Sequence, residues 1–151
     1  MKIEEVTHSA RALSINKKIL QKVIFTQNSL HESFNDVLKP YDLSSEQFNV
    51  LEILNDLKGK PANMCMIQEK MTAKTSNTTR LVDKLLLKRL VTREVCNENR
   101  RKIEVFITEK GVNIIKEIEP LLHIIEEKFA NNMTLNELET LNVLLMKYIQ
   151  D

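Results

Sequence analysis

The sequence predicts a mainly α-helical fold that contains one small β-hairpin. Apolar residues recur at helical spacing over long stretches near both ends of the chain. Only two glycines and three prolines occur among the 151 residues, which leaves little room for long loops. Two short runs rich in β-branched residues, 91–96 and 103–107, flank a charged turn, as in a hairpin. The length suits one ordinary domain, and we expect residues 1–151 to form a single domain.

The first helix is predicted over 14–39. Its apolar residues, from Ile19 to Leu38, lie on more than one face. At a rise of roughly 1.5 Å per residue the helix is about 38 Å long, too long for a small domain to cover alone. We therefore expect part of it to pack on a second copy of the chain. Pro40 ends the helix, because proline lacks the N–H that a helix interior needs.

Three shorter helices follow. Ser44 and Gln47 have the spacing of a capping box and begin the second helix. Asn63 caps a third helix over 64–71, and a link of three residues leads to a fourth over 75–89. Two helices joined by so short a turn form a helix-turn-helix, although this turn lacks the glycine that such turns often carry.

The hairpin, or wing, is followed by two further helices. Thr108 is placed to cap a fifth helix, in which Pro120 is expected to produce a kink rather than an end. Thr134 and Glu137 form a second capping box, which opens the last helix. Both helices carry continuous apolar stripes, which we interpret as core and dimer seam.

This order of elements gives the middle of the chain a separate role. We predict dimerisation helices at 14–39 and 109–151 and, between them, a winged helix-turn-helix lobe at 44–108. The stretch 58–102 holds 12 Lys or Arg and 4 Asp or Glu, a net charge of +8. The rest of the chain holds 10 and 17, a net charge of −7. A basic centre between acidic ends indicates a surface that faces a polyanion.

The fourth helix and the wing carry side chains that can read DNA. A helix N-terminus can enter the major groove, where short polar side chains and arginine bond to base edges. Arginines of a hairpin turn can reach phosphates or the minor groove. The predicted base contacts are Ser76, Asn77, Thr79 and Arg80, the predicted wing contacts are Arg100 and Arg101, and the predicted phosphate contacts are Lys74, Lys84 and Arg93.

These assignments have structural alternatives. Ser76 and Asn77 could merely cap the fourth helix, and the two wing arginines could be a solvated charge run. Thr78 and Val82 share a stripe with Leu85, so we expect them to face inward. Asp83 is expected to orient Arg80 or Lys84 rather than to touch anionic DNA.

Over 43–111 the chain resembles the MarR (multiple-antibiotic-resistance regulator) family. Residues 43–51 resemble the opening of the family's second helix, and 79–85 resemble its recognition helix. Arg100-Arg101 and 107–111 resemble its wing and the exit from the wing. The resemblance implies a homodimeric winged-helix regulator that binds pseudo-palindromic double-stranded DNA. It also implies repression that ends when a small phenolic or lipophilic effector binds between the dimer and reading lobes.

Two residues depart from the family pattern. Asn99 stands where the family usually has Asp before the two arginines, and the loss of a carboxylate predicts a looser wing and stronger nonspecific binding. Arg89 stands where the family usually has Gly at the end of the recognition helix. If that position needs a positive φ, an arginine there is strained.

A ligand pocket is predicted where the first, second and fifth helices meet the reading lobe, with Ile24, His31, Phe48 and Leu51 as its lining. A purely structural histidine is the alternative for His31. Two other functions remain open: a winged-helix module that binds protein, and a constitutive DNA-binding protein without a ligand. The basic centre argues against the first, whereas the sequence does not separate the second from the main reading.

The sequence predicts no enzyme, cofactor or metal site. It has no glycine-rich phosphate loop, no Gly-x-Ser-x-Gly and no cysteine–histidine pair with an orienting acid. The histidines, His8, His31 and His123, do not have metal-ligand spacing. The two cysteines make no disulfide framework; we expect Cys65 to act as a small buried hydrophobe and Cys96 to be the more exposed thiol.

The sequence also predicts a cytoplasmic protein. The acidic residues of 1–6 do not fit the basic start and apolar core of a signal peptide. No apolar run approaches the roughly 18 residues of a membrane span, so no membrane partner is expected.

Overall fold

The computed structural model describes residues 3–149, with side chains from Ser14 onward. The chain divides into two compact units, residues 1–45 and 46–151, and each is described by itself. The N-terminal residues that argue against a signal peptide, and the side chain of His8, lie outside the described side chains. Within the described part of the chain, no helix is long and apolar enough to cross a lipid bilayer.

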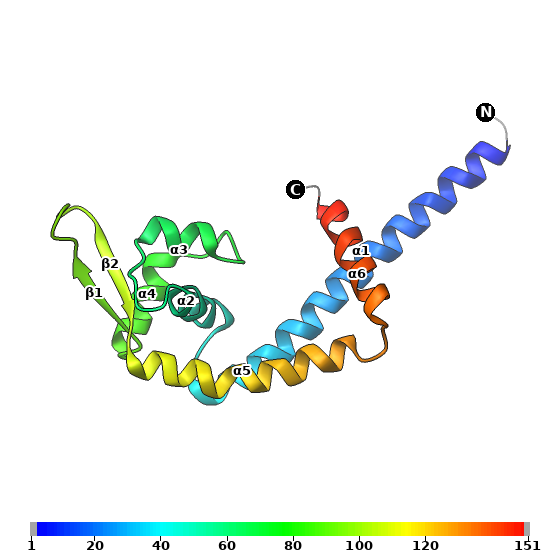
Figure 1. Cartoon of the computed structure of the whole chain (residues 1–151). Helices are drawn as coiled ribbons and strands as arrows, with labels where there is room; N and C mark the ends of the chain where they lie inside the picture. Colours follow the sequence, from blue (N-terminus) through cyan, green and yellow to red (C-terminus); the bar gives the residue numbers. More distant parts are fainter. Residues whose placement is uncertain (1–2, 150–151) are drawn as a thin grey trace. The chain divides into compact units, whose positions relative to one another are not determined.

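The first unit is one long helix, α1 (Ile3–Leu38), followed by the 3-10 turn η1 (Lys39–Tyr41) (Figure 1). The helix begins at Ile3, so the predicted start at residue 14 is wrong. Residues 3–13 contain no proline or glycine, and helical backbone there does not require the apolar periodicity on which the prediction relied. As predicted, the helix ends beside Pro40, where Asp42 adopts a left-handed conformation and donates its N–H to the Lys39 carbonyl at 3.0 Å.

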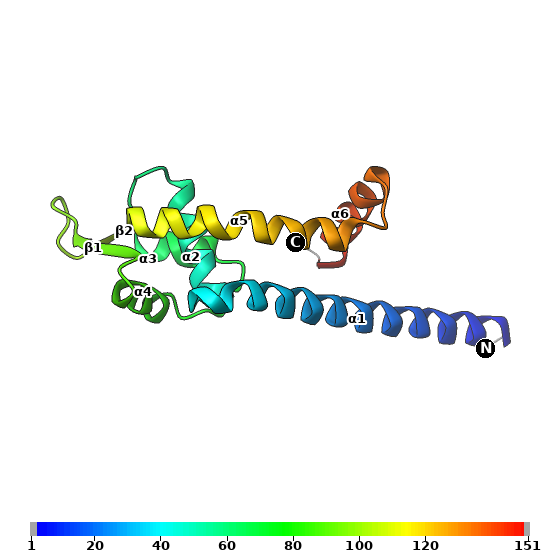
Figure 2. The ribbon, with the colours of Figure 1, turned by 90° about the horizontal axis from the view of Figure 1, so that it is seen from below.

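The second unit holds the helix-turn-helix, the hairpin and the last two helices (Figure 2). Its elements are α2 (Ser45–Asp56), α3 (Met64–Lys70), α4 (Thr78–Leu87), β1 (Val91–Val95), β2 (Ile103–Ile107), α5 (Glu109–Ala130) and α6 (Leu135–Ile149). The fourth helix is shorter than the predicted 75–89, because 72–77 form a turn and Asn77 caps the helix. α5 does not end at Pro120, as expected, and the kink there stays a prediction.

The hairpin is a two-stranded antiparallel sheet that pairs Val91 with Ile107 and Val95 with Ile103. The other edge of β2 is paired as well, because Val105 and Ala62 exchange two backbone hydrogen bonds of 2.8 and 3.0 Å. These bonds attach the wing to the segment that leads into α3.

Predicted caps fix the starts of three helices. The Asn63 side chain accepts from the Met66 N–H at 2.8 Å, and the Thr108 hydroxyl accepts from the Gly111 N–H at 3.1 Å. Thr134 and Glu137 form the reciprocal capping box, with bonds of 2.8 and 3.2 Å.

One apolar core holds the lobe together. It takes side chains from α2, α3, α4, both strands and α5, and burying each large one contributes about 1.5–3 kcal/mol. The fully buried members include Leu51, Leu54, Ile67, Met71, Val82, Leu85, Leu90, Val105, Ile115 and Ile118.

Candidate nucleic-acid interface

Helix α4 has one buried side and one open side. Thr78, Val82 and Leu85 are 5%, 0% and 0% exposed, so the predicted inward stripe is confirmed. Thr79 and Arg80, which follow the buried Thr78, are exposed. The packing of the buried stripe on the core therefore presents the polar side of the helix N-terminus to solvent.

The predicted contacts before α4 lie in the turn rather than in the helix. Ser76 is half-buried, and its N–H donates to the Ala73 carbonyl at 3.1 Å. Asn77 is exposed and caps the helix, because its side-chain oxygen accepts from the Arg80 N–H at 3.2 Å. The capping alternative thus holds for Asn77, whose side-chain NH₂ still has donors available for an external partner.

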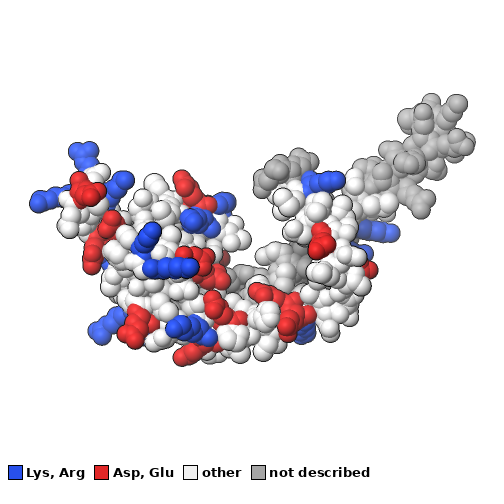
Figure 3. Space-filling model, in the orientation of Figure 1, with Lys and Arg blue, Asp and Glu red and all other residues white. Residues whose placement is uncertain are grey.

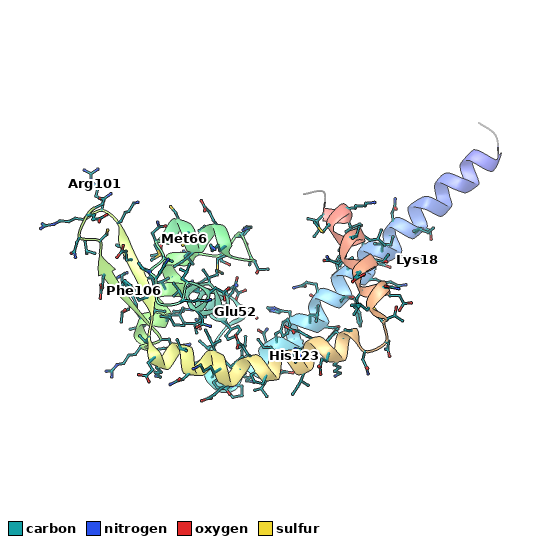
Figure 4. All side chains as sticks on the ribbon, viewed as in Figure 1. Lys18, Glu52, Met66, Arg101, Phe106 and His123 are labelled. Carbon is teal, nitrogen blue, oxygen red and sulfur yellow. The ribbon has the colours of Figure 1, made fainter. Side chains whose placement is uncertain are left out.

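The wing ends in a turn that carries Arg100 and Arg101, both exposed. Figure 3 shows cationic side chains projecting at the tip of the hairpin, and Figure 4 places Arg101 there. The Asn99 side-chain oxygen accepts from the Arg101 N–H at 3.1 Å, and the Asn99 carbonyl accepts from Lys102 at 2.9 Å. Asn99 therefore orders the turn through its own backbone and amide, a role that an aspartate is not needed to fill.

Asp83 pairs with Arg93 of β1, at 3.2 Å, and not with Arg80 or Lys84 as predicted. Asp83 pairs with Arg93 because the tertiary structure brings β1 beside α4 (Figure 1). Both side chains are about half exposed, so the pair is worth little in stability. Arg93 keeps further N–H donors, so the pair does not conflict with its predicted phosphate contact.

The remaining predicted phosphate contacts, Lys74 and Lys84, are exposed. The Lys74 ammonium donates to the Glu69 carbonyl at the end of α3. Of the nine predicted DNA contacts, eight are therefore exposed and Ser76 is half-buried. All nine come from the turn before α4, from α4 and from the wing.

Arg89 terminates α4 with a φ of 60°, the conformation that the family's usual glycine adopts without strain. Its N–H donates to Leu86 and the Leu90 N–H donates to Leu85, both at 3.0 Å. These are the two bonds of a Schellman motif, so the helix ends as it would with glycine but with a side chain in the left-handed region.

Two amide side chains that the sequence analysis did not single out hold the turn before α4. The Gln68 side-chain nitrogen donates to the Lys74 carbonyl at 2.9 Å, and its oxygen accepts from the Thr78 hydroxyl. The Asn49 side-chain oxygen accepts from the Thr72 N–H at 2.9 Å. The missing glycine of this turn is the sequence signal that could have prompted a search for such bonds.

The four predicted ligand contacts occupy different environments. Phe48 and Leu51 are 4% and 0% exposed and belong to the lobe core, whereas Ile24 and His31 are exposed on α1. The lobe does carry a hollow between α2 and α5, lined by other residues: Asn49, Glu52, Ile53, Asn55, Asp56, Lys70 and Glu119.

Glu52 is the half-buried carboxylate of this hollow (Figure 4). Burial raises the pKa of the Glu52 carboxyl, and the nearby carboxylates Asp56, Glu119 and Glu126 act in the same direction. A hydrogen bond from the Asn49 side chain opposes the rise.

The cysteines differ from expectation. Cys65 is exposed on α3 and Cys96 is half-buried, the reverse of the predicted order. The buried positions of α3 and its C-cap are taken by Ile67 and Met71, so Cys65 lies on the outer side of this one-sided helix.

Comparisons with known proteins agree with this geometry. Residues 43–103 match the model of the MarR family. The match covers the helix-turn-helix and the wing as far as the start of β2, which are the elements that carry all the predicted DNA contacts.

Among curated proteins, the chain is 30% identical over 92 residues to the HTH-type transcriptional regulator MhqR of Bacillus subtilis. The alignment covers 61% of this chain and 62% of that protein. Among solved structures, E. coli MarR in complex with operator DNA superposes with a TM-score of 0.77 at 22% identity, covering 87% of this chain and 93% of that one. Bordetella bronchiseptica BpsR, whose DNA binding is regulated by 6-hydroxynicotinic acid, gives 0.76 at 18%, covering 87% and 92%. At these identities the structures establish the winged-helix fold.

Proposed function

We propose that this chain is a transcription regulator that binds specific DNA sequences through α4 and the wing. The observation that carries the proposal is the exposure of eight of the nine predicted contacts, on the turn before α4, on α4 and on the wing. Base edges would be read by the group at the start of α4, and phosphates and the minor groove by the wing and the lysines. The family match over 43–103 supports the same conclusion.

A homodimer is part of this proposal. α1 exposes Ile15, Ile19, Leu20, Ile24 and Phe25, each at least 41% exposed, and none of the described residues of α6 is buried. Exposed apolar surface of this extent indicates a protein partner. A second copy also suits pseudo-palindromic DNA, whose half-sites lie about 34 Å apart and require two recognition helices.

Release of DNA by a small phenolic or lipophilic effector completes the proposal, with repression as the resting state. BpsR, whose fold this chain shares, has its DNA binding regulated by an aromatic acid. An effector shifts the population of DNA-competent dimers only by its differential affinity for the two states.

Fluorescence anisotropy with DNA from upstream of the chain's own gene tests the proposal, with a scrambled duplex as the control. We expect a specificity ratio above about 10³ and a steep salt dependence. Arg80→Ala should lower the ratio, whereas Lys84→Ala should weaken binding to both duplexes alike. Absence of binding even at low salt would instead favour a module that binds protein.

A further inference from the structure

We propose that Gln68 of α3 and Asn49 of α2 are positioning residues that set where the DNA-reading end of α4 stands, and so determine sequence specificity without belonging to the recognition helix. The proposal rests on the DNA-binding function proposed above. We call the two side chains, with their bonds to Thr72, Lys74 and Thr78, the amide clasp.

The turn that the clasp holds needs support from side chains. Residues 72–77 contain no glycine, and one backbone bond within them, from the Ser76 N–H to the Ala73 carbonyl, spans 3.1 Å. Five of the six, all except Ser76, are exposed. A turn of this kind has few contacts of its own to fix the helix that follows it.

Gln68 joins the turn to the helix with both ends of its amide. Its nitrogen donates to the Lys74 carbonyl, and its oxygen accepts from Thr78, the first residue of α4. Thr78 is 5% exposed, so its hydroxyl would lose a partner in a site that water scarcely reaches if Gln68 were removed. The bonds therefore tie the first turn of α4 to the last turn of α3.

Asn49 fixes the beginning of the same turn. Its oxygen accepts from the Thr72 N–H at 2.9 Å, across 23 positions in the sequence. A hydrogen bond from the same side chain acts to lower the pKa of the Glu52 carboxyl, against the effect of burial. One carboxamide thus connects α2, the hollow and the start of the turn.

Position matters here because bidentate base contacts tolerate little displacement. Each of the predicted base contacts Ser76, Asn77, Thr79 and Arg80 lies within two residues of Lys74 or Thr78. A shift of this end of α4 would misalign hydrogen bonds to base edges, while phosphate contacts of flexible lysines would adjust. Loss of the clasp should therefore reduce specific binding and spare nonspecific binding.

The test measures affinities of the full chain for the upstream duplex that it binds best and for a scrambled duplex. Gln68→Ala and Thr78→Val should each lower the specificity ratio roughly 10-fold, the effect of about one mismatched base pair. Thr78→Ser keeps the hydroxyl and should retain the ratio. Asn113→Ala, an exposed change on α5, serves as the control. A ratio unchanged in both clasp variants, or an equal loss of affinity for both duplexes, would overturn the proposal.

A second measurement is independent of DNA. Amide hydrogen exchange of Thr72 should accelerate in Asn49→Ala and stay slow in Asn49→Asp, which keeps the accepting oxygen. Equal protection of Thr72 in wild type and Asn49→Ala would refute the clasp even if the wild-type chain showed no sequence preference. In a different outcome, the wild type would bind both duplexes equally and the Thr72 amide would exchange fast only in Asn49→Ala. That result would refute the proposed function and the specificity role but support the clasp.

Discussion

Helices α4 and α6 are both amphipathic, but their apolar sides differ in burial. α4 buries Val82 and Leu85 completely in the core of its own lobe, whereas α6 leaves Leu144 54% and Met146 64% exposed. The lobe therefore completes its core with its own elements, while the described apolar side chains of α6 are not buried. Under the proposed function, α4 reads DNA and needs a position fixed by its own fold, whereas α6 keeps its apolar stripe available to join two copies.

Truncating a buried side chain of α4 should have the largest effect on stability. Leu85→Ala removes a side chain with 0% exposure, and we expect it to lower the free energy of unfolding by about 2–5 kcal/mol. Leu144→Ala removes a half-exposed leucine of α6 and should change the lobe's stability by less than about 0.5 kcal/mol. Its effect should instead be a weaker dimer.

Urea unfolding at two protein concentrations separates the two effects, with sedimentation to report the dimer. The Leu85→Ala loss should be the same at both concentrations. The Leu144→Ala loss should shrink on dilution, because the dimer contributes less stability to both chains as they dissociate. An equally large, concentration-independent loss in Leu144→Ala would mean that α6 packs on its own chain and would remove the contrast.

A substitution at Gly111 tests how closely α5 packs against Leu90 and Ile107. A Cβ at this position would stand 2.5 Å from the Leu90 carbonyl oxygen and 2.8 Å from Ile107 Cγ1. Gly111→Ala should therefore destabilise the lobe by about 1–3 kcal/mol, despite alanine's better helix propensity. Lys116→Ala, on an exposed position of α5, is the matched control in the same urea titration. If Gly111→Ala were as stable as that control, the approach of α5 to Leu90 would be looser than described.

Arg89→Gly should strengthen the lobe. Glycine removes the strain of the left-handed conformation, roughly 1–2 kcal/mol. Its greater conformational entropy in the unfolded chain lowers stability by about 0.5–1 kcal/mol. The net gain should reach about 1 kcal/mol, seen as a higher urea midpoint at an unchanged slope. Lys84→Gly, within the same helix, should lose about 1 kcal/mol. Losses of similar size in both variants would contradict the positive φ at Arg89.

Local signals predicted much of this lobe. Asn63, Thr108 and Thr134 bond within three residues of themselves, so sequence spacing is enough to predict their caps. The inward stripe of α4 follows from its 3.6-residue period. The exact start of α4 does not follow, since Thr75, Ser76 and Asn77 all suit an N-cap and the bond between Thr78 and Gln68 is tertiary.

The features that escaped prediction depend on how distant segments meet. The Arg93 partner of Asp83 appears only once β1 lies beside α4, and the bond between Asn49 and Thr72 joins residues 23 positions apart. The exposure of Cys65 depends on which side of the short helix α3 meets the core, and a helix of seven residues gives too little periodicity to tell.

The smallest expected effect on stability comes from Glu52, in the hollow between α2 and α5, and this effect depends on pH. Glu52 faces Asp56 on its own helix, Glu119, His123 and Glu126 on α5, and Lys70 on α3. Because burial raises the pKa of the Glu52 carboxyl, the folded chain holds this proton more tightly than the unfolded chain. Its stabilising contribution is therefore complete below the ordinary value of 4.5 and is lost as pH rises through the raised value.

Glu52→Gln should accordingly raise the melting temperature at pH 7, with a gain that shrinks as pH falls towards 4.5. Glutamine keeps an oxygen for the Asn49 amide, so the turn before α4 should be undisturbed. Glu69→Gln, on an exposed position of α3, should show no such pH-dependent gain and is the control for charge alone. Melting curves at several pH values test this prediction. If the rise in melting temperature caused by Glu52→Gln grew towards low pH, the ionised carboxylate would stabilise the lobe, contrary to the prediction.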